Sequence, residues 1–304
     1  MAASSSSKWF WGIFISLFIA GLFFIGICFL FFASAIKNRG IEYTSYGSGD
    51  KIAIVEINDV IITSEKSVEQ IKRFREDKSV KAIIIRINSP GGGVAASQEI
   101  YEEVKRTRDS GKLVVVSMGS IAASGGYYIA CGSNLIVANP GTLTGSIGVI
   151  AQFISIKDLA DKLGIKETTI KSGELKDSGD PFREMNEKDR VYFQDVVDNS
   201  FSQFIEMVAR ERKMNIDTLR QYANGRVFTG LQAKNIGLID SLGTFEDAIR
   251  ITTKMAGIEG EPRIIRERKK FSLFEEFLGT KIEDVTDIKH HLFDEPIMQY
   301  KFTP

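Results

Sequence analysis

The sequence predicts an α/β fold in which parallel strands are covered by helices, preceded by one N-terminal transmembrane helix. From residue 51 to residue 256, short apolar runs of strand length alternate with amphipathic segments of helix length. Ahead of them, residues 9–36 contain no charged side chain. A stretch of about 20 apolar residues is enough to span a bilayer.

Composition excludes several classes of protein. The chain has 304 residues, 43% of them hydrophobic, and no net charge, with 39 basic and 39 acidic residues. This length fits one large or two ordinary domains, and the balanced charge gives no reason to expect nucleic acid as a partner. Two cysteines cannot form a disulfide framework or a cysteine-rich zinc site, so we expect neither a metal nor another cofactor. The only histidines are His290 and His291, near the C-terminus, so a hydrolase on this chain would need another base.

The apolar segment is predicted to be an uncleaved anchor, residues 1–36, that contacts the lipid bilayer through residues 9–36. Trp9 and Trp11 lie at its leading edge, where interfacial aromatic residues are common. A cleaved signal peptide has a shorter apolar region, of about 7–15 residues. Residues 33–35, Ala-Ser-Ala, nevertheless resemble a cleavage site. The flanking charges do not define the orientation.

The remaining chain divides into three parts. Residues 37–50, rich in Gly and Ser, are predicted to be a linker, residues 51–267 the main domain, and residues 268–304 a C-terminal extension. In the extension, Phe271, Phe274 and Phe277 suggest a small amphipathic helix. The expected strands are 51–57, 80–87, 113–116 and 135–137, and the expected helices are 67–76, 94–108, 124–131, 186–213 and 244–256.

The first of three Gly/Ser-rich turns follows the Ile-rich strand at residues 88–93, Asn-Ser-Pro-Gly-Gly-Gly. Its glycines let the backbone approach a ligand closely, and their amides can point at an oxyanion. An ordinary strand-to-helix turn is an equally good interpretation. The turn lacks the Lys-Ser/Thr of a phosphate-binding P-loop, which argues against nucleotide binding.

The second turn is Gly119–Tyr128, where Ser124 stands at the start of a helix. Ser124 is either the N-cap of that helix or a nucleophile surrounded by small residues. The amide of Gly125 would lie beside an oxyanion formed at Ser124. The third turn, Gly141–Gly148, is a weak signal alone, and the lysines of residues 171–177 would by default be solvated surface charges.

In combination these motifs resemble the bacterial signal peptide peptidases of the SppA type, in the short form with one catalytic unit. The motifs are Pro-Gly-Gly after a strand, Ala-Ser-Gly-Gly-Tyr-Tyr at a helix start, Thr-Gly-Ser-Ile-Gly, and a Lys-Ser-Gly stretch ending in Lys-Asp. The resemblance covers residues 50–257 and includes the anchor. It implies a ClpP/crotonase-like body of repeated ββα units and a serine endopeptidase with a Ser-Lys dyad.

The resemblance also assigns roles. Ser124 corresponds to the nucleophile and Lys176 to the general base, with Ser146 as the hydrogen-bond partner of the lysine amine. The oxyanion hole would use the backbone amides of Gly92 and Gly125. Spacing alone does not exclude Lys171 as the base.

A serine–lysine mechanism is physically sound, because a serine needs an adjacent base and a lysine can act as one when burial favours its neutral form. A carboxylate beside the amine would oppose this. We therefore expect Asp177 to point away from Lys176, with Ser146 as the polar partner of the amine. The dyad can also be completed between neighbouring subunits, so a separation within one chain would not refute it.

By resemblance, the substrates are cleaved signal peptides and other hydrophobic, unfolded segments. The resemblance also implies a homo-oligomeric ring and a catalytic domain on the extracytoplasmic side of the cytoplasmic membrane. Three alternatives remain open: a stomatin-operon partner protease, a crotonase-type acyl-CoA enzyme, and an inactive membrane scaffold. The Tyr127-Tyr128 pair argues against the first, and the absence of carboxylates flanking the Gly91–Gly93 and Gly125–Gly126 turns argues against the second.

Overall fold

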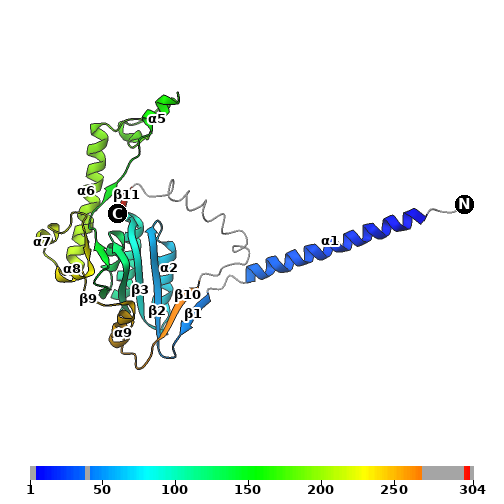
Figure 1. The fold of residues 1–304 in the computed structure, drawn as a ribbon, viewed down its shortest axis with the longest axis horizontal. Coiled ribbons are helices and arrows are strands. Elements are labelled where there is room, and N and C mark those ends of the chain that lie inside the picture. The colour runs from blue at the N-terminus through cyan, green and yellow to red at the C-terminus, as the bar shows by residue number, and fades with distance from the viewer. Residues whose placement is uncertain (1–4, 38–41, 269–297, 302–304) are drawn as a thin grey trace. The chain divides into compact units, whose positions relative to one another are not determined.

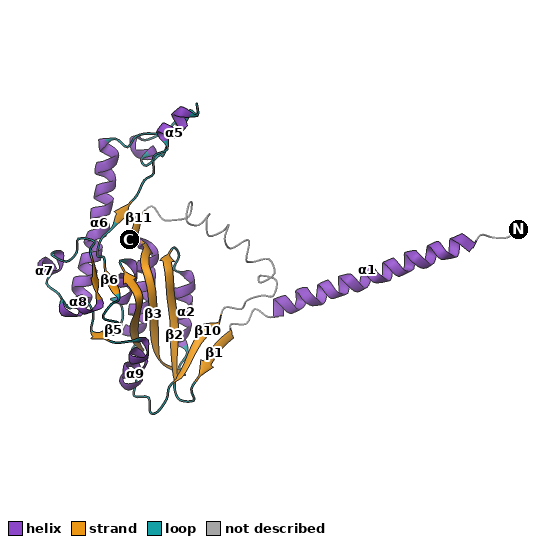
Figure 2. Cartoon of the chain, in the orientation of Figure 1, coloured by secondary structure: helices purple, strands orange, loops and turns teal. Residues whose placement is uncertain are grey.

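The computed structural model describes residues 5–37, 42–268 and 298–301, and its central feature is one mixed sheet (Figures 1 and 2). The strands are β1 Glu42–Tyr46, β2 Lys51–Ile61, β3 Val80–Gly93, β4 Leu113–Ala123, β5 Leu135–Ala138, β6 Leu143–Gly145, β7 Ile150–Ala151, β8 Val227–Thr229, β9 Ser241–Leu242, β10 Arg263–Arg268 and β11 Met298–Lys301. The helices are α1 Ser5–Lys37, α2 Glu65–Glu76, α3 Val94–Asp109, α4 Gly125–Ala130, α5 Lys157–Lys162, α6 Glu187–Arg212, α7 Ile216–Arg220, α8 Gly230–Asn235 and α9 Phe245–Met255, with a 3₁₀-helix η1 at Glu174–Asp177.

The main path of the sheet runs in the order β1-β10-β2-β3-β4-β5-β9, and the pairs from β10 to β9 are parallel. Strands β6, β7, β8 and β11 extend the sheet beyond this path. Strand β8 pairs antiparallel with β6, and β11 pairs antiparallel with β3 and with β7. The α/β prediction is confirmed, although the sheet is mixed rather than wholly parallel. Strand β4 pairs with β5 through residues 115–117 and with β6 through residues 121–123. This long strand therefore has two different neighbours on one side before helix α4 begins.

Both faces of the sheet are buried, which explains why its central strands are almost continuously apolar. Alternate residues of β3 point into different cores, with Ile83, Ile85 and Ile87 on one face and Ala82 and Ile84 on the other. The first face packs against α2, α3, α4 and α6, and the second packs against α9. These layers hold the carboxyl ends of β3, β4 and β6 at fixed positions.

Helix α6 is bounded where the sequence predicts. Asn186 and Asp189 form a capping box at its start, each side chain accepting a hydrogen bond from the other residue's backbone amide. Lys213 ends the helix in the left-handed conformation, with φ 52°. The segment that carries α5 lies at the far end of α6 from the sheet (Figure 1).

Two predicted boundaries are wrong in part. The expected linker, 37–50, contains β1, which pairs with β10 at the edge of the sheet. The expected C-terminal extension, 268–304, contains β11, which pairs with β3 and β7 inside the main domain. Both strands are short: β1 shows no regular alternation, and the apolar–polar alternation of β11, Met-Gln-Tyr-Lys, covers only four residues. The helix expected around residues 271–277 lies outside the described residues.

The N-terminal segment is helical, as predicted, and forms α1. Its side chains are exposed wherever they are described, including Trp9, at 76%, and Trp11, at 59%. No helix within the described ranges qualifies as one that could span a membrane.

Candidate active site

Ser124 stands between β4 and α4 in a strained conformation. Its φ is 52° and its ψ is −112°, outside the regions that non-glycine residues normally adopt. The residue is 1% exposed, and its amide donates a 2.8 Å hydrogen bond to the carbonyl of Gly145. It occupies the N-cap position of α4, but its side chain makes no capping hydrogen bond. The Ser124 hydroxyl therefore does not cap α4, so helix capping does not explain why a serine occupies this position.

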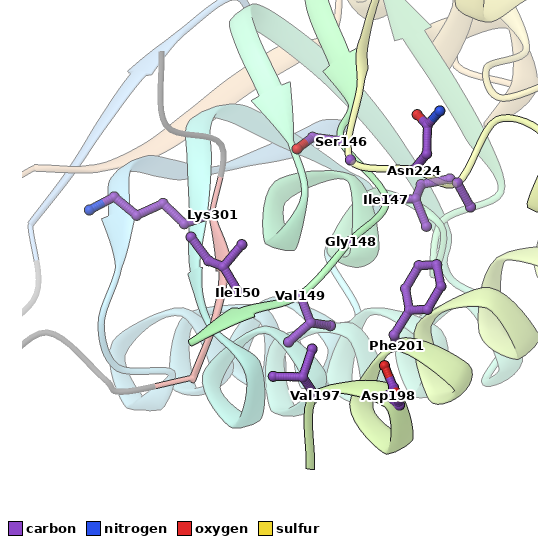
Figure 3. A pocket seen from close by; sticks show the side chains of 12 residues that line it. Ser146, Ile147, Gly148, Val149, Ile150, Val197, Asp198, Phe201, Asn224 and Lys301 are labelled. Atoms are coloured by element: carbon purple, nitrogen blue, oxygen red, sulfur yellow. The ribbon is translucent and has the colours of Figure 1, made fainter. Parts of the chain in front are cut away.

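Ser146 occupies the corresponding place on the neighbouring strand. Strands β4 and β6 are parallel, and Ala123 pairs with Gly145, so Ser124 and Ser146 follow a matched pair of strand ends. Ser146 also has a positive φ, 51°, and its amide donates a 2.9 Å hydrogen bond to the carbonyl of Arg226. Its side chain lines a cavity of about 480 Å³ beside α6 (Figure 3). Two of the predicted site residues are thus brought to one edge of the sheet.

The glycines at the end of β3 lie next to the start of α4. Gly91 has φ 106°, and a methyl group on it would lie 2.7 Å from the amide nitrogen of Gly125. The same methyl group would lie 1.9 Å from the carbonyl oxygen of Tyr300. Only glycine fits there, because a side chain would occupy the space that the carbonyl fills. The amide of Gly91 is hydrogen-bonded to the Ser89 hydroxyl, at 3.1 Å, which leaves Gly92 as the predicted second donor.

Strand β11 lies along these glycines as an extended peptide. It pairs antiparallel with β3, Tyr300 opposite Gly92, and antiparallel with β7, Gln299 opposite Ile150. Its backbone is therefore bound along both edges. This is how a sheet-adding peptide is held in a groove between two strands.

A pocket of aromatic side chains encloses Tyr300, which is fully buried. Its ring stacks on Tyr128 at a centroid distance of 5.2 Å and packs against Phe204 at 4.6 Å. Its hydroxyl donates a 3.1 Å hydrogen bond to the carbonyl of Ser200. Burial raises the pKa of the Tyr300 hydroxyl, so that group stays a donor at neutral pH. The pocket thus satisfies both the ring and the hydroxyl of a tyrosine.

Lys176 lies in η1, and its side chain is exposed. The hydrogen bonds and ion pairs of the described residues do not join Lys176 to Ser124 or to Ser146. Within one chain, the structure therefore does not bring the predicted base to the predicted nucleophile. The assignment of Lys176 remains a prediction.

The carboxylate of Asp177 is engaged by other cations. Lys171 Nζ lies 2.6 Å from Asp177 Oδ1, and a guanidinium nitrogen of Arg183 lies 3.1 Å from the same oxygen. The hydrogen bond from Lys171 and the pairing with Arg183 lower the pKa of Asp177. The expected arrangement, in which Asp177 does not pair with Lys176, agrees with these contacts. Lys171, the alternative base, is engaged by this ion pair.

Arg183 links this loop to the start of α6. It forms a 2.5 Å ion pair with Asp189, which also accepts a hydrogen bond from the Ser178 hydroxyl. The Arg183 and Ser178 hydrogen bonds lower the pKa of Asp189 below its usual range. The loop that carries Lys176 is therefore fixed by ion pairs rather than by an apolar core.

Sequence reasoning missed two residues of this site. Tyr300 lies in Met-Gln-Tyr-Lys, where apolar and polar residues alternate, but over only four residues this was a weak signal for a strand. Ser97, in α3, is buried at 0% exposure and its hydroxyl has no hydrogen-bond partner among the described residues. A methyl group on Gly125 would lie 2.4 Å from that hydroxyl. The position of Ser97 four residues beyond the Gly-Gly-Gly turn was its only signal.

The described residues contain no group of three or more His, Cys, Asp and Glu side chains able to hold a metal ion. The groups that the described residues gather at this site are two hydroxyls, backbone amides and strand β11.

Two family models match the chain. Residues 106–259 match the model described as peptidase family S49, and residues 46–140 match the Clp protease model. Together they cover the glycines of β3, Ser124, Ser146 and the 171–177 loop.

Named relatives agree with these models. The Enterococcus faecium protein named signal peptide peptidase SppA is 32% identical over 295 residues, covering 88% of this chain and 86% of that protein. Protease 4 of Salmonella typhi is 36% identical over 236 residues, covering 73% of this chain and 38% of that protein. The chloroplastic serine protease SPPA of Arabidopsis thaliana is 36% identical over 239 residues, covering 74% of this chain and 35% of that protein.

Among solved structures, a membrane-bound stomatin-specific protease superposes with a TM-score of 0.44 at 21% identity, over 67% of this chain and 85% of that one. ClpP1 from Listeria monocytogenes superposes with a TM-score of 0.43 at 16% identity, over 64% of this chain and 93% of that one.

Proposed function

Because the chain belongs to peptidase family S49 and is a serine peptidase, we propose that it is an endopeptidase with a Ser124–Lys176 dyad. The observation that carries the proposal is the position of β11. The chain's own segment β11 lies extended along Gly91–Gly93, and its Tyr300 carbonyl borders Gly91 and Gly125, the residue that follows Ser124. A substrate bound in the same way would present a carbonyl to the serine.

In the proposed reaction, Lys176 accepts the Ser124 proton and Ser124 Oγ attacks the peptide carbonyl. The amides of Gly92 and Gly125 stabilise the oxyanion, because a fixed backbone donor needs no reorganisation when the charge develops. Lys176 then protonates the leaving amine, and water hydrolyses the acyl-enzyme. Ser146 holds the lysine amine between these steps.

The base comes from a neighbouring subunit in this proposal. Lys176 is exposed in the single chain, in a loop that ion pairs join to the start of α6, whereas Ser124 is buried at the strand ends. A base lysine must be neutral, and burial favours the neutral form. Packing of the 171–177 loop onto the next copy in a homo-oligomeric ring supplies both burial and contact.

Mixing two inactive variants tests this arrangement. Ser124→Ala and Lys176→Ala should each abolish peptide hydrolysis, and an active-site serine reagent should label Ser124 in the unmodified protein. A dissociated and reassembled mixture of the two variants should regain part of the activity, since some interfaces then carry one intact serine and one intact lysine. Retained turnover in either single variant contradicts the dyad. A mixture as inactive as its components contradicts the shared site.

The proposed substrates are cleaved signal peptides and other hydrophobic, unfolded segments. Support comes from the relative named signal peptide peptidase and from the apolar pocket around Tyr300. A panel of released signal peptides, compared with polar peptides of equal length, checks this. Equal turnover of the two groups contradicts the substrate class.

We place the enzyme in the cytoplasmic membrane, with the catalytic domain on the extracytoplasmic side. The support is the uncharged sequence of residues 9–36, although no described helix qualifies as a membrane span. Alkaline carbonate extraction of membranes from cells that express the chain, with and without residues 1–36, checks attachment. Release of the full-length chain by carbonate contradicts the anchor. Protection of the catalytic domain from protease added to spheroplasts contradicts the side.

A further inference from the structure

We propose that the Ser97 hydroxyl is a third donor of the oxyanion hole, beside the backbone amides of Gly92 and Gly125. The proposal rests on the serine peptidase activity proposed above and adds a residue to that site. Three features of Ser97 carry it: its unused hydroxyl, its contact with Gly125, and the packing that holds it there.

Ser97 buries a hydroxyl that the fold does not use. The side chain is 0% exposed, and its oxygen has no hydrogen-bond partner within the described part of the chain. A buried serine or threonine in a helix can satisfy its hydroxyl on the carbonyl four residues earlier. Thr107 does so in the same helix, 2.7 Å from the Glu103 oxygen, and Thr252 does so in α9. Ser97 does not, although Gly93 offers the equivalent carbonyl, so the helix does not explain this hydroxyl.

The hydroxyl lies against Gly125. A methyl group on Gly125 would lie 2.4 Å from Ser97 Oγ and 3.2 Å from the Tyr300 carbonyl oxygen. The hydroxyl and a carbonyl of the strand in the groove are therefore on the same side of Gly125. Because Gly125 directly follows Ser124, an oxyanion bound by the Gly125 amide lies next to this hydroxyl.

Packing between α3 and α4 holds the hydroxyl in place. Tyr101, one turn after Ser97, packs edge-on against Tyr128, one turn after Gly125. The ring centroids are 5.2 Å apart, the interplanar angle is 80°, and both rings are buried. The two helices thus meet at the serine and at the rings, so the distance between Ser97 and Gly125 is set before a substrate binds.

A fixed hydroxyl without a partner suits a charge that exists only during the reaction. The hydrogen of a serine hydroxyl rotates to the best acceptor. An oxyanion attracts it more strongly than a neutral carbonyl does, since hydrogen bonds to charged atoms are about twice as strong as neutral ones. The hydroxyl gives up no other hydrogen bond with the described residues, so the gain goes to the transition state. Its removal should therefore lower kcat and leave KM almost unchanged.

Two variants of the full-length chain, purified in detergent, test the proposal. Ser97→Ala should lower kcat for a hydrophobic peptide about tenfold, because one donor to a charged oxygen is lost. Its free energy of unfolding should equal or exceed that of the unmodified protein, because an unsatisfied buried hydroxyl is removed. Thr107→Val is the matched control, since it removes a buried hydroxyl from the same helix. It should lower the free energy of unfolding, because it deletes a hydrogen bond that the fold uses, and leave kcat unchanged.

A peptide aldehyde provides a second measurement. Ser124 adds to the aldehyde carbon, and the oxygen of the tetrahedral adduct then occupies the oxyanion hole. Ser97→Ala should bind the aldehyde about tenfold more weakly than the unmodified protein does, as expected for an analogue of the transition state. The corresponding peptide alcohol forms no adduct and should bind both proteins equally.

Three results overturn the proposal. One is a Ser97→Ala variant with unchanged kcat and unchanged affinity for the aldehyde. Another is a raised KM at unchanged kcat, which would place the hydroxyl on the bound substrate rather than on the oxyanion. The third is a loss of kcat accompanied by a lower free energy of unfolding, as a purely structural residue would give. If the unmodified protein neither hydrolyses peptides nor binds the aldehyde, the proposed function fails, and the third donor fails with it.

Discussion

Ser124 and Ser146 follow directly after Ala123 and Gly145, which are paired residues of two parallel strands, and both serines have a positive φ near 50°. Neither hydroxyl forms a hydrogen bond with another described residue. The sheet therefore presents two adjacent, uncommitted hydroxyls at one edge, where the end of β11 also lies.

The strain at Ser124 predicts an unusual order of stability among its variants. A non-glycine residue in such a conformation costs about 1–3 kcal/mol, and glycine removes that cost. Greater freedom of glycine in the unfolded chain offsets about 0.5–1 kcal/mol. We expect the free energy of unfolding of Ser124→Gly to be about 1 kcal/mol higher than that of Ser124→Ala. Both variants should be inactive. Denaturant titration of both variants measures this, and the reverse order would show that the conformation is not strained.

Gly125 should not tolerate a side chain. A methyl group would lie 2.4 Å from the Ser97 hydroxyl and 3.2 Å from the Tyr300 carbonyl, so the amide would have to move. Loss of one oxyanion donor lowers kcat by about a hundredfold to a thousandfold. We expect a fall of this size in Gly125→Ala, with KM for a short peptide changing much less.

Removing the Ser97 side chain tests whether that contact is the cause. The double variant Ser97→Gly/Gly125→Ala should recover part of the lost kcat, because the hydroxyl no longer opposes the methyl group. Gly141→Ala is the control, since nothing lies within 4 Å of its added methyl group. If the double variant is as slow as Gly125→Ala, the contact with the Ser97 hydroxyl is not the cause of the lost kcat. The contact of the methyl group with the Tyr300 carbonyl would then be the cause.

Acid should break the ion pairs that hold the loop carrying Lys176. Its Asp177 and Asp189 carboxylates have lowered pKa values in the folded protein, because of hydrogen bonds and ion pairs with Lys171 and Arg183. Their stabilising contribution is complete above the unfolded value, about 3.9, and is lost as the pH falls through the lower folded values. Hydrogen-exchange protection of residues 171–189 should therefore be constant from pH 7 to pH 5 and fall below pH 4.

Asp189→Asn at pH 7 should reproduce the acid effect, because it removes the charge that Arg183 pairs with. Asp195→Asn, on the same helix and exposed, is the control. Protection that is lost already between pH 7 and pH 5 would contradict the lowered pKa values.

Cys131 should be unreactive in the folded protein. It is 3% exposed, and burial raises the pKa of its thiol to about 12, so almost no thiolate exists at pH 8. In a Cys28→Ser background, a disulfide-exchange reagent should modify no thiol until denaturant is added. Prompt modification of the native protein would show that α4 opens to solvent.

Sequence patterns predicted the parts of the fold that depend on local physics. The apolar run of β3 and the extent of α6 were both correctly placed, because a buried strand and an amphipathic helix each leave a pattern within a few residues. The motif around Ser124 does lie at a strand end, and the role of Ser124 as nucleophile stays a prediction. The structure added that its side chain does not cap α4.

Other features depend on distant parts of the chain and left no such mark. Strand β11 is held by backbone pairing with residues some 200 positions away, and its short alternation, Met-Gln-Tyr-Lys, does not indicate which strand it pairs with. The place of Lys176 depends on the ion pairs that join its loop to the start of α6, and the local sequence does not indicate those partners.

The double-sided pairing of β11 has a consequence for what this groove admits. A guest segment must have both edges of its backbone free, and a helix or an internal strand of a folded protein has neither. Most of the contact is made through the main chain, which every sequence shares. On the proposed function, the groove would admit unfolded polypeptide and exclude folded proteins, whose backbone edges are already hydrogen-bonded.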